Sequence, residues 1–233
     1  MKLEINYNNK KYALNLNNGV DLSIPNKFLG RGPTFFNAEY PHTNPVKSDN
    51  FIGDIRKGGS CNASIATIDI HCSGTHTEFV GHVEDSDYSI TDKCPLELIP
   101  TYLISILPQP FNSTNETYHC SLSSELVLTK ESIEKKTIKE IEALIIRTLP
   151  NDRSKRLRNY DIDTPPFFTN DAIEILQYIG IKHLLVDLPS IDKLDDEGQL
   201  GNHRKFFKNG ETISELLYIP NNLKDGFGFL QIQ

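Results

Sequence analysis

One stretch of eleven residues carries most of the side chains that could do chemistry. It holds a thiol, two imidazoles and a carboxylate at intervals of four, two and four residues, namely Cys72, His76, Glu78 and His82. Side chains at even spacing emerge on one face of an extended chain, so these four would point the same way and His71 the other. Gly74 and Gly81 permit bends, so this arrangement is an expectation from spacing alone.

These side-chain types favour a metal site. Thiolate, imidazole and carboxylate groups bind Zn²⁺ and related divalent ions. An ion held by some of them would acidify a water molecule while one histidine stayed free to move protons, which is hydrolytic chemistry. On spacing alone, a set of unrelated polar residues remains an open alternative. For His42, His119 and His183 we expect ordinary packing or surface roles.

The same segment resembles the signature of the cyclase family of metal-dependent hydrolases, which includes bacterial kynurenine formamidases and isatin hydrolases. The family pattern is H-x-G-T-H-x-D-x-P-x-H, and this chain reads CSGTHTEFVGH. The Gly-Thr-His core matches outright and His82 falls at the final histidine. Cys72 stands at the first histidine, Glu78 at the aspartate and Val80 at the proline. Cysteine can still ligate through sulfur, glutamate keeps the carboxylate on a longer side chain, and valine loosens the turn.

Two more segments extend the resemblance. Residues 185–192, LVDLPSID, resemble the family's strand that ends in a D-T-P-S-x-D turn. His203 then falls at the family's later metal-binding histidine, and Glu215, twelve residues beyond, at its metal-binding glutamate. Residues 20–25, VDLSIP, are similar to the family's D-L-S opening. The likeness therefore covers most of the chain and is strong in two segments.

The resemblance implies a ligand set and a proton carrier. The implied metal ligands are His76, Glu78, His203 and Glu215, with Cys72 as a fifth candidate. Zinc is the expected ion and manganese the alternative. One ion is expected and a second is in doubt, because the residue at position 72 replaces a histidine that serves the family's binuclear site. His82 would take a proton from the attacking water and return it to the departing nitrogen of an amide.

The implied activity is that of a metal-dependent amidohydrolase acting on non-peptide C–N bonds. An arylformamidase of this kind, like kynurenine formamidase, cleaves N-formylkynurenine to formate and kynurenine in tryptophan catabolism. Two alternatives stay open: a hydrolase of the same family acting on an isatin-like lactam, and a binding protein that kept the fold without the activity. The family also implies a homo-oligomer, a dimer or tetramer, with sites near subunit contacts.

Composition limits the kind of protein and its partners. The chain has 233 residues, 38% hydrophobic and 24% charged, which predicts one packed domain over residues 1–233. A net charge of −7 without a long basic run argues against a nucleic-acid partner. Neither an apolar leader nor a membrane-length apolar run occurs in the sequence. We therefore expect a cytoplasmic protein with a small-molecule amide substrate and no membrane partner.

The elements that must position these residues follow from periodicity and turn signals. In the first part of the chain we predict a hairpin over 3–16, a strand over 20–25 and an ordered loop region over 30–59. A buried strand over 63–70 and short β pieces within 96–107, separated by prolines, are expected next. The last part should form a helix over 129–140, a strand over 143–148, a helix from an Asn170 cap to Gly180, and a strand over 182–189. A helix leading into an apolar strand occurs twice. This order predicts an α/β class with a mixed β-sheet flanked by helices. The resemblance implies the family's version of it, a swivelling β/β/α-like fold.

Overall fold

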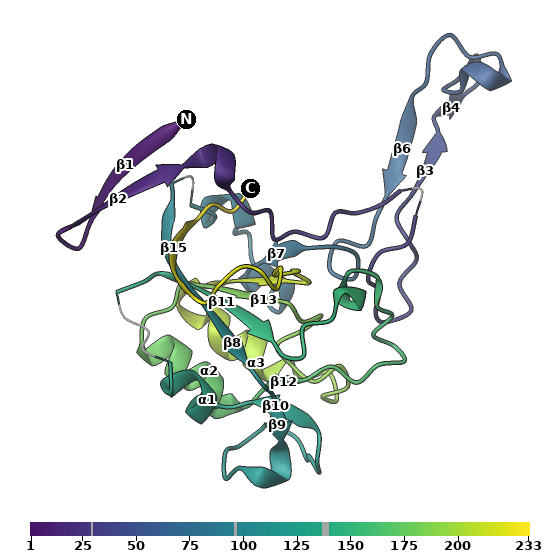
Figure 1. Ribbon diagram of the computed structural model, residues 1–233. Helices are drawn as coiled ribbons and strands as arrows, with labels where there is room; N and C mark the ends of the chain where they lie inside the picture. The colour runs from purple at the N-terminus through teal and green to yellow at the C-terminus, as the bar shows by residue number, and fades with distance from the viewer. Residues whose placement is uncertain (29, 96, 137–139) are drawn as a thin grey trace.

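The centre of the molecule is a six-stranded mixed sheet. The computed structural model describes residues 1–28, 30–95, 97–136 and 140–233. In spatial order the strands are β15 (Gly226–Leu230), β8 (Ile99–Ile106), β11 (Ala143–Thr148), β13 (His183–Val186), β14 (Thr212–Glu215) and β7 (His76–Glu78) (Figure 1). The four inner strands are parallel, and the two edge strands β15 and β7 run antiparallel to them. The predicted α/β class with a mixed sheet is confirmed.

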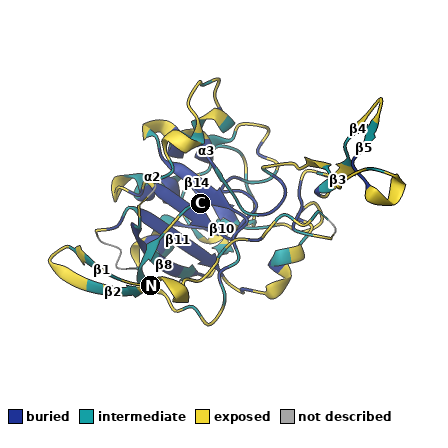
Figure 2. Cartoon of the chain, turned by 90° about the horizontal axis from the view of Figure 1, so that it is seen from above, coloured by how far each residue is buried: buried dark blue, intermediate teal, exposed yellow. Residues whose placement is uncertain are grey.

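The two faces of the sheet are covered differently. Successive residues of a strand point to opposite faces, so Leu144 and Ile146 of β11 join one apolar cluster and Ile145 joins another. The first cluster also takes in buried residues of the three α-helices, α1 (Lys130–Glu134), α2 (Asn170–Tyr178) and α3 (Gly201–Phe206). The second is closed by irregular segments, among them Leu217 and Ile219. Figure 2 shows the buried strands at the centre of the molecule.

Short elements complete the fold. A small sheet orders β12 (Phe167–Phe168), β10 (Leu126–Leu128) and β9 (Gln109–Pro110). Single 3₁₀ turns occupy Leu16–Asn18, Ile55–Lys57, Val80–His82, Ile90–Asp92, Phe111–Ser113, Arg153–Leu157 and Phe207–Asn209. Within the described ranges, no helix combines the length and apolar character needed to cross a membrane.

Helices α1 and α2 begin at hydroxyl caps. Thr129 caps α1 through the backbone of Ser132, and α1 ends at Glu134, earlier than predicted. Residues 137–139 of that predicted helix lie outside the described residues. For α2 the cap is Thr169 and not Asn170, which is the first helical residue. The threonine hydroxyl accepts from the N–H three residues on and occupies the N-cap geometry, one position earlier than the sequence suggested.

The central strand β8 is longer than predicted. The prolines were expected to divide the 96–107 region, but Pro100 is the second residue of an eight-residue strand. Its missing N–H is tolerated near the strand's beginning, and its carbonyl accepts from the N–H of Glu142. Residue 96 lies outside the described residues.

The N-terminal hairpin is confirmed, whereas the strand predicted over 20–25 is wrong. Strands β1 (Lys2–Tyr7) and β2 (Lys10–Asn15) pair antiparallel around a two-residue turn. The 20–25 segment is extended but joins no ladder. Instead Ile24 exchanges hydrogen bonds with Thr75, and the carbonyl of Leu22 accepts from the N–H of Tyr218. This segment therefore ties two distant loops together.

A two-stranded arm projects from the body, as Figure 1 shows. It consists of β3 (His42–Pro45) and β6 (Ser64–Thr67), with β4 (Lys47–Ser48) and β5 (Phe51–Ile52) toward its tip. The prediction of an ordered loop region over 30–59 missed strands β3, β4 and β5, and the strand predicted over 63–70 is present as β6 but is not buried. All four residues of β6 are exposed, because its only ladder partner within the described chain is β3 and no second layer covers the ribbon.

A buried ion pair fixes the end of β11 against the segment after β13. Nζ of Lys155 lies 2.7 Å from Oδ2 of Asp187, and the exposed fractions of these side chains are 5% and 0%. The lysine also donates to the carbonyl and hydroxyl oxygens of Thr148. Burial raises the pKa of Asp187 even though the lysine beside it opposes the shift. The carboxylate is therefore tolerated only with its partner in place.

We expect Lys155→Met to lower the free energy of unfolding by about 3–5 kcal/mol, because it leaves a buried carboxylate without a counter-charge. Urea denaturation followed by circular dichroism measures the change. Lys182→Met is the matched control: Nζ of Lys182 lies at the same 2.7 Å from Oε2 of Glu142, but the two side chains are 63% and 43% exposed. We expect it to cost less than about 1 kcal/mol. Equal losses in the two variants would contradict this explanation.

Candidate metal centre

The edge strand β7 and its neighbour β14 set three of the predicted site residues side by side. His76 and Glu78 are two positions apart in β7 and so share a face. In the antiparallel register Glu215 lies directly opposite His76. Thr77, between the two, bonds instead to the hydroxyl of Ser214 at 2.8 Å. Strand pairing thus brings together residues that are far apart in the sequence, since Thr77 and Ser214 are separated by 137 positions.

The Gly-Thr pair before His76 has a structural role. Gly74 has a φ of 71°, and a Cβ built there would lie 2.7 Å from the carbonyl oxygen of Ile24. The hydroxyl of Thr75 donates to the carbonyl of Leu216 at 2.5 Å and accepts from the N–H of Ile24 at 2.7 Å. These contacts lock the turn to two other segments, and they fix where β7 begins.

Helix α3 delivers His203 from the opposite side. The backbone N–H groups of Asn202 and His203 donate to the carboxylate of Asp192 at 3.0 and 3.1 Å. The same carboxylate lies 2.8 Å from Nδ1 of His203. The ring therefore turns Nε2 toward the two acids, 2.9 Å from Oε1 of Glu78 and 3.4 Å from Oε1 of Glu215. Asp192 thus fixes both the helix end and the ring orientation.

The side chains converge on Glu78. Its Oε2 lies 3.2 Å from Nδ1 of His71, 3.6 Å from Nε2 of His82 and 4.0 Å from Nε2 of His76. Oε2 of Glu215 lies 3.8 Å from Nε2 of His76. The structure therefore gathers His76, Glu78, His203, Glu215 and His82 at one place. Their roles as ligands and proton carrier remain predictions.

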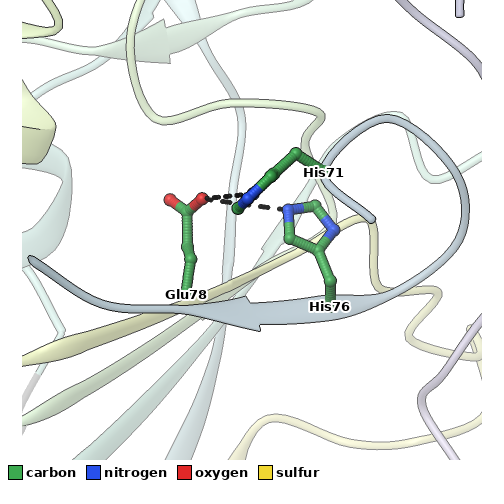
Figure 3. A group of neighbouring side chains, drawn as sticks. All are labelled: His71, His76 and Glu78. Atoms are coloured by element: carbon green, nitrogen blue, oxygen red, sulfur yellow. Dashed lines mark hydrogen bonds and ion pairs between the residues drawn. The ribbon is translucent and has the colours of Figure 1, made fainter. Parts of the chain in front are cut away.

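The one-face prediction for the histidine-rich segment is wrong for two residues, His71 and Cys72. His71 was expected to point away, yet its ring faces Glu78 beside His76 (Figure 3). Cys72, the fifth ligand candidate, is instead 8% exposed and packs in an apolar cluster with Phe35, Tyr160 and Leu216. Burial raises the pKa of its thiol to about 12. The chain turns at Gly74 and again at Val80–His82, so the extended spacing holds only from His76 to Glu78.

His82 is more exposed than the two predicted histidine ligands, His203 and His76, although the His71 side chain is more exposed still, at 36%. His82 ends the 3₁₀ turn Val80–His82, and its side chain is 25% exposed, against 2% for His203 and 11% for His76. Burial lowers the pKa of His82, so its imidazole is mostly neutral at pH 7. A neutral ring at the solvent boundary of the cluster can accept a proton from water.

The charges of the cluster fit a divalent cation. Glu78 and Glu215 are both buried, and within the described chain neither carboxylate has a lysine or arginine partner. Burial and the nearby Glu78 charge raise the pKa of Glu215 to about 7. Nε2 of His76 is buried without a hydrogen-bond partner among the described residues, and Oε1 of Glu78 faces only Nε2 of His203, at 2.9 Å. Two acids and free donor atoms facing one another are the donor set that zinc or manganese binds.

A second group of polar side chains, made up of His119, Asp192 and Asp196, lies next to this cluster. Nε2 of His119 lies 3.1 Å from Oδ2 of Asp196 and 3.7 Å from Oδ1 of Asp192. The carboxylate oxygens of Asp192 and Asp196 already accept backbone N–H groups, including that of Leu200. We predicted an ordinary packing or surface role for His119, and the structure places its ring beside the acid that orients His203 while its hydrogen bonds go to Asn170 and Asp196.

We expect Asp192→Asn to weaken metal binding by about 10- to 100-fold, because the amide no longer holds the His203 ring through a charged acceptor. Competition against a chromophoric zinc chelator measures the affinity. Asp195→Asn, which changes a neighbouring acid whose side chain is exposed, should leave the affinity unchanged. An unaltered affinity in the Asp192 variant would show that packing alone orients the histidine.

The fold and the cluster define an α/β protein with a site suited to a divalent cation at the edge of its mixed sheet. A family model named Cyclase matches residues 20–193, and the chain belongs to this family. The resemblance inferred from the motifs is therefore confirmed. The match ends before His203 and Glu215, so their place in the site rests on the structure.

The relatives of the chain are hydrolases. The chain is 27% identical to the kynurenine formamidase of Bacillus thuringiensis subsp. konkukian over 73% of its own length and 71% of the relative's. It is 26% identical to that of Bacillus anthracis over 81% and 79% of the two lengths. Together with the family match, these relatives support a hydrolase.

Two solved structures share the fold. A potential metal-dependent hydrolase with cyclase activity superposes with a TM-score of 0.58 at 18% identity, covering 89% of this chain and 85% of the other. Isatin hydrolase A from Labrenzia aggregata superposes with a TM-score of 0.55 at 18% identity, covering 89% and 83%. At this identity the likeness establishes the architecture alone.

Proposed function

We propose that the chain is a metal-dependent amidohydrolase with arylformamidase activity, acting on N-formylkynurenine in cytoplasmic tryptophan catabolism. The observation that carries the proposal is the buried pair Glu78 and Glu215, ringed by imidazoles and lacking a lysine or arginine partner in the described chain. The substrate choice draws on the relatives named kynurenine formamidase.

The chain's residues would divide the work between binding and proton transfer. His76, Glu78, His203 and Glu215 would hold the ion, zinc in the first place and manganese as the alternative. When bound, a divalent ion supplies a Lewis acid that polarises the amide carbonyl and acidifies the attacking water. Asp192 keeps Nε2 of His203 aimed into the cluster from the far side.

His82 is the proton carrier in this proposal. Its Nε2 lies 3.6 Å from Oε2 of Glu78, and its ring reaches solvent, where an amide substrate must arrive. The neutral imidazole would accept a proton from the attacking water. The resulting imidazolium would then donate that proton to the departing nitrogen, which leaves as the neutral amine.

The test is a substrate panel on metal-analysed protein. Purified chain is stripped with a chelator, reloaded with zinc or manganese, and assayed with N-formylkynurenine and with isatin. We expect metal-dependent release of formate from the first and much slower opening of the second. Faster isatin opening would replace the arylformamidase with a lactam hydrolase. Stoichiometric metal without turnover of either compound would favour a binding protein.

We also propose that the chain forms a homo-oligomer, a dimer or tetramer. Apolar side chains lie exposed on and beside the arm: Ile55, Ile65 and Ile70 are 57%, 58% and 60% exposed. Burying them against another subunit would remove apolar surface from water. Light scattering after size exclusion should give a mass of two or four chains, and Ile65→Asp should shift it toward the 26.4 kDa monomer. A wild-type monomer would exclude the assembly.

A further inference from the structure

The chain lacks the first histidine of its family's motif, yet an imidazole lies where that ligand would be needed. Cys72 stands at the motif position, one residue after His71. Nδ1 of His71 lies 3.2 Å from Oε2 of Glu78, and its ring centroid is 5.4 Å from that of His76. One donor atom from each of these three residues lies within 4.8 Å of the others. Figure 3 shows the His71 ring turned toward the strand that carries the other two.

The local backbone explains why the side chain of His71 and not that of Cys72 faces the acids. The carboxylate of Asp69 accepts the N–H groups of both His71 and Cys72 at 3.2 Å, which fixes a turn at this point. The two side chains then diverge. The thiol enters the apolar cluster of Phe35 and Tyr160, while the imidazole faces the acids and keeps a 36% exposed side chain.

The two oxygens of Glu78 face different partners. Oε2 is directed toward His71 and His76, and Oε1 toward His203. A carboxylate placed between two sets of nitrogen donors can bridge two ions, which in binuclear hydrolytic sites lie about 3.5–4 Å apart. The donor count on the His71 side is three, as many protein ligands as a catalytic zinc ion commonly has.

We infer that His71 takes the place of the motif's first histidine and, with His76 and Glu78, binds a second divalent ion, while the thiol of Cys72 binds none. The inference rests on the proposed metal-dependent function and deepens it. The sequence left the second ion in doubt because position 72 was the natural place to look for its ligand.

The experiment counts ions in three proteins: wild type, His71→Ala and Cys72→Ser. Each is stripped, reloaded with excess zinc, desalted and analysed by elemental mass spectrometry. We expect two ions per chain in the wild type and in Cys72→Ser, and one in His71→Ala. Cobalt-loaded wild type should show no thiolate-to-metal charge-transfer band in the near ultraviolet. Circular dichroism confirms that the His71 variant is folded, as its partly exposed side chain leads us to expect.

Other outcomes would overturn the inference. Two ions in His71→Ala, or one in the wild type, would show that His71 holds none. A thiolate band that disappears in Cys72→Ser would assign the ligand to the sulfur. Failure of this inference can be told apart from failure of the proposed function. If His71→Ala loses one ion but the wild type hydrolyses no amide, this inference is supported and the proposed activity is contradicted. If His71→Ala keeps both ions and remains active, this inference alone is contradicted.

Discussion

Replacing Glu78 with alanine is expected to remove the bound metal and to lower kcat/KM for N-formylkynurenine by about a thousandfold or more. Four histidines lie within 4.0 Å of this carboxylate, and its oxygens face both donor sets of the cluster. A catalytic ion supplies several kcal/mol of transition-state stabilisation. Since about 1.4 kcal/mol corresponds to a factor of ten in rate, losing about 4 kcal/mol gives the expected effect. Elemental analysis and formate release measure the two changes.

Two further variants at Glu78 separate charge from shape. Glu78→Gln keeps the size of the side chain and removes the charge, so it should lose metal as alanine does. Glu78→Asp restores the family's motif residue on a side chain one methylene shorter, so it should retain metal with reduced affinity. Near-stoichiometric zinc in the alanine and glutamine variants would remove Glu78 from the ligand set.

The parts of the site that could be predicted are those whose geometry is local. His76 and Glu78 share a face because two residues of one strand must, whatever the rest of the fold does. His203 and Glu215 required the resemblance, since nothing local distinguishes them from a basic helix end and a strand residue. Their meeting with Glu78 depends on the register of β14 against β7 and on Asp192 turning the His203 ring.

The residues that were missed depend on turns and on distant partners. His71 was assigned to the wrong face because even spacing assumes an extended chain, whereas Asp69 and Gly74 turn the backbone there. A signal was nevertheless present, since a histidine adjoins the substituted motif position. The burial of β6 was predicted from its apolar residues, but burial requires a covering layer, and the arm projects from the body.

The second large effect concerns His82. We expect His82→Ala to lower kcat by about 10²- to 10⁴-fold, the usual contribution of a positioned acid–base group, while the metal content stays near that of the wild type. The reason is geometric: the His82 side chain is 25% exposed at the border of the cluster, whereas that of His203 is 2% exposed and is held by Asp192.

The control for this variant is His42→Ala, which changes a histidine on the arm whose ring lies 3.3 Å from the carbonyl oxygen of Tyr40. It should leave turnover and metal content unchanged. Added imidazole should restore part of the activity of His82→Ala, since a small base can diffuse into the space left by a solvent-facing ring. If the variant instead loses an ion and imidazole restores nothing, His82 is a ligand and not the proton carrier.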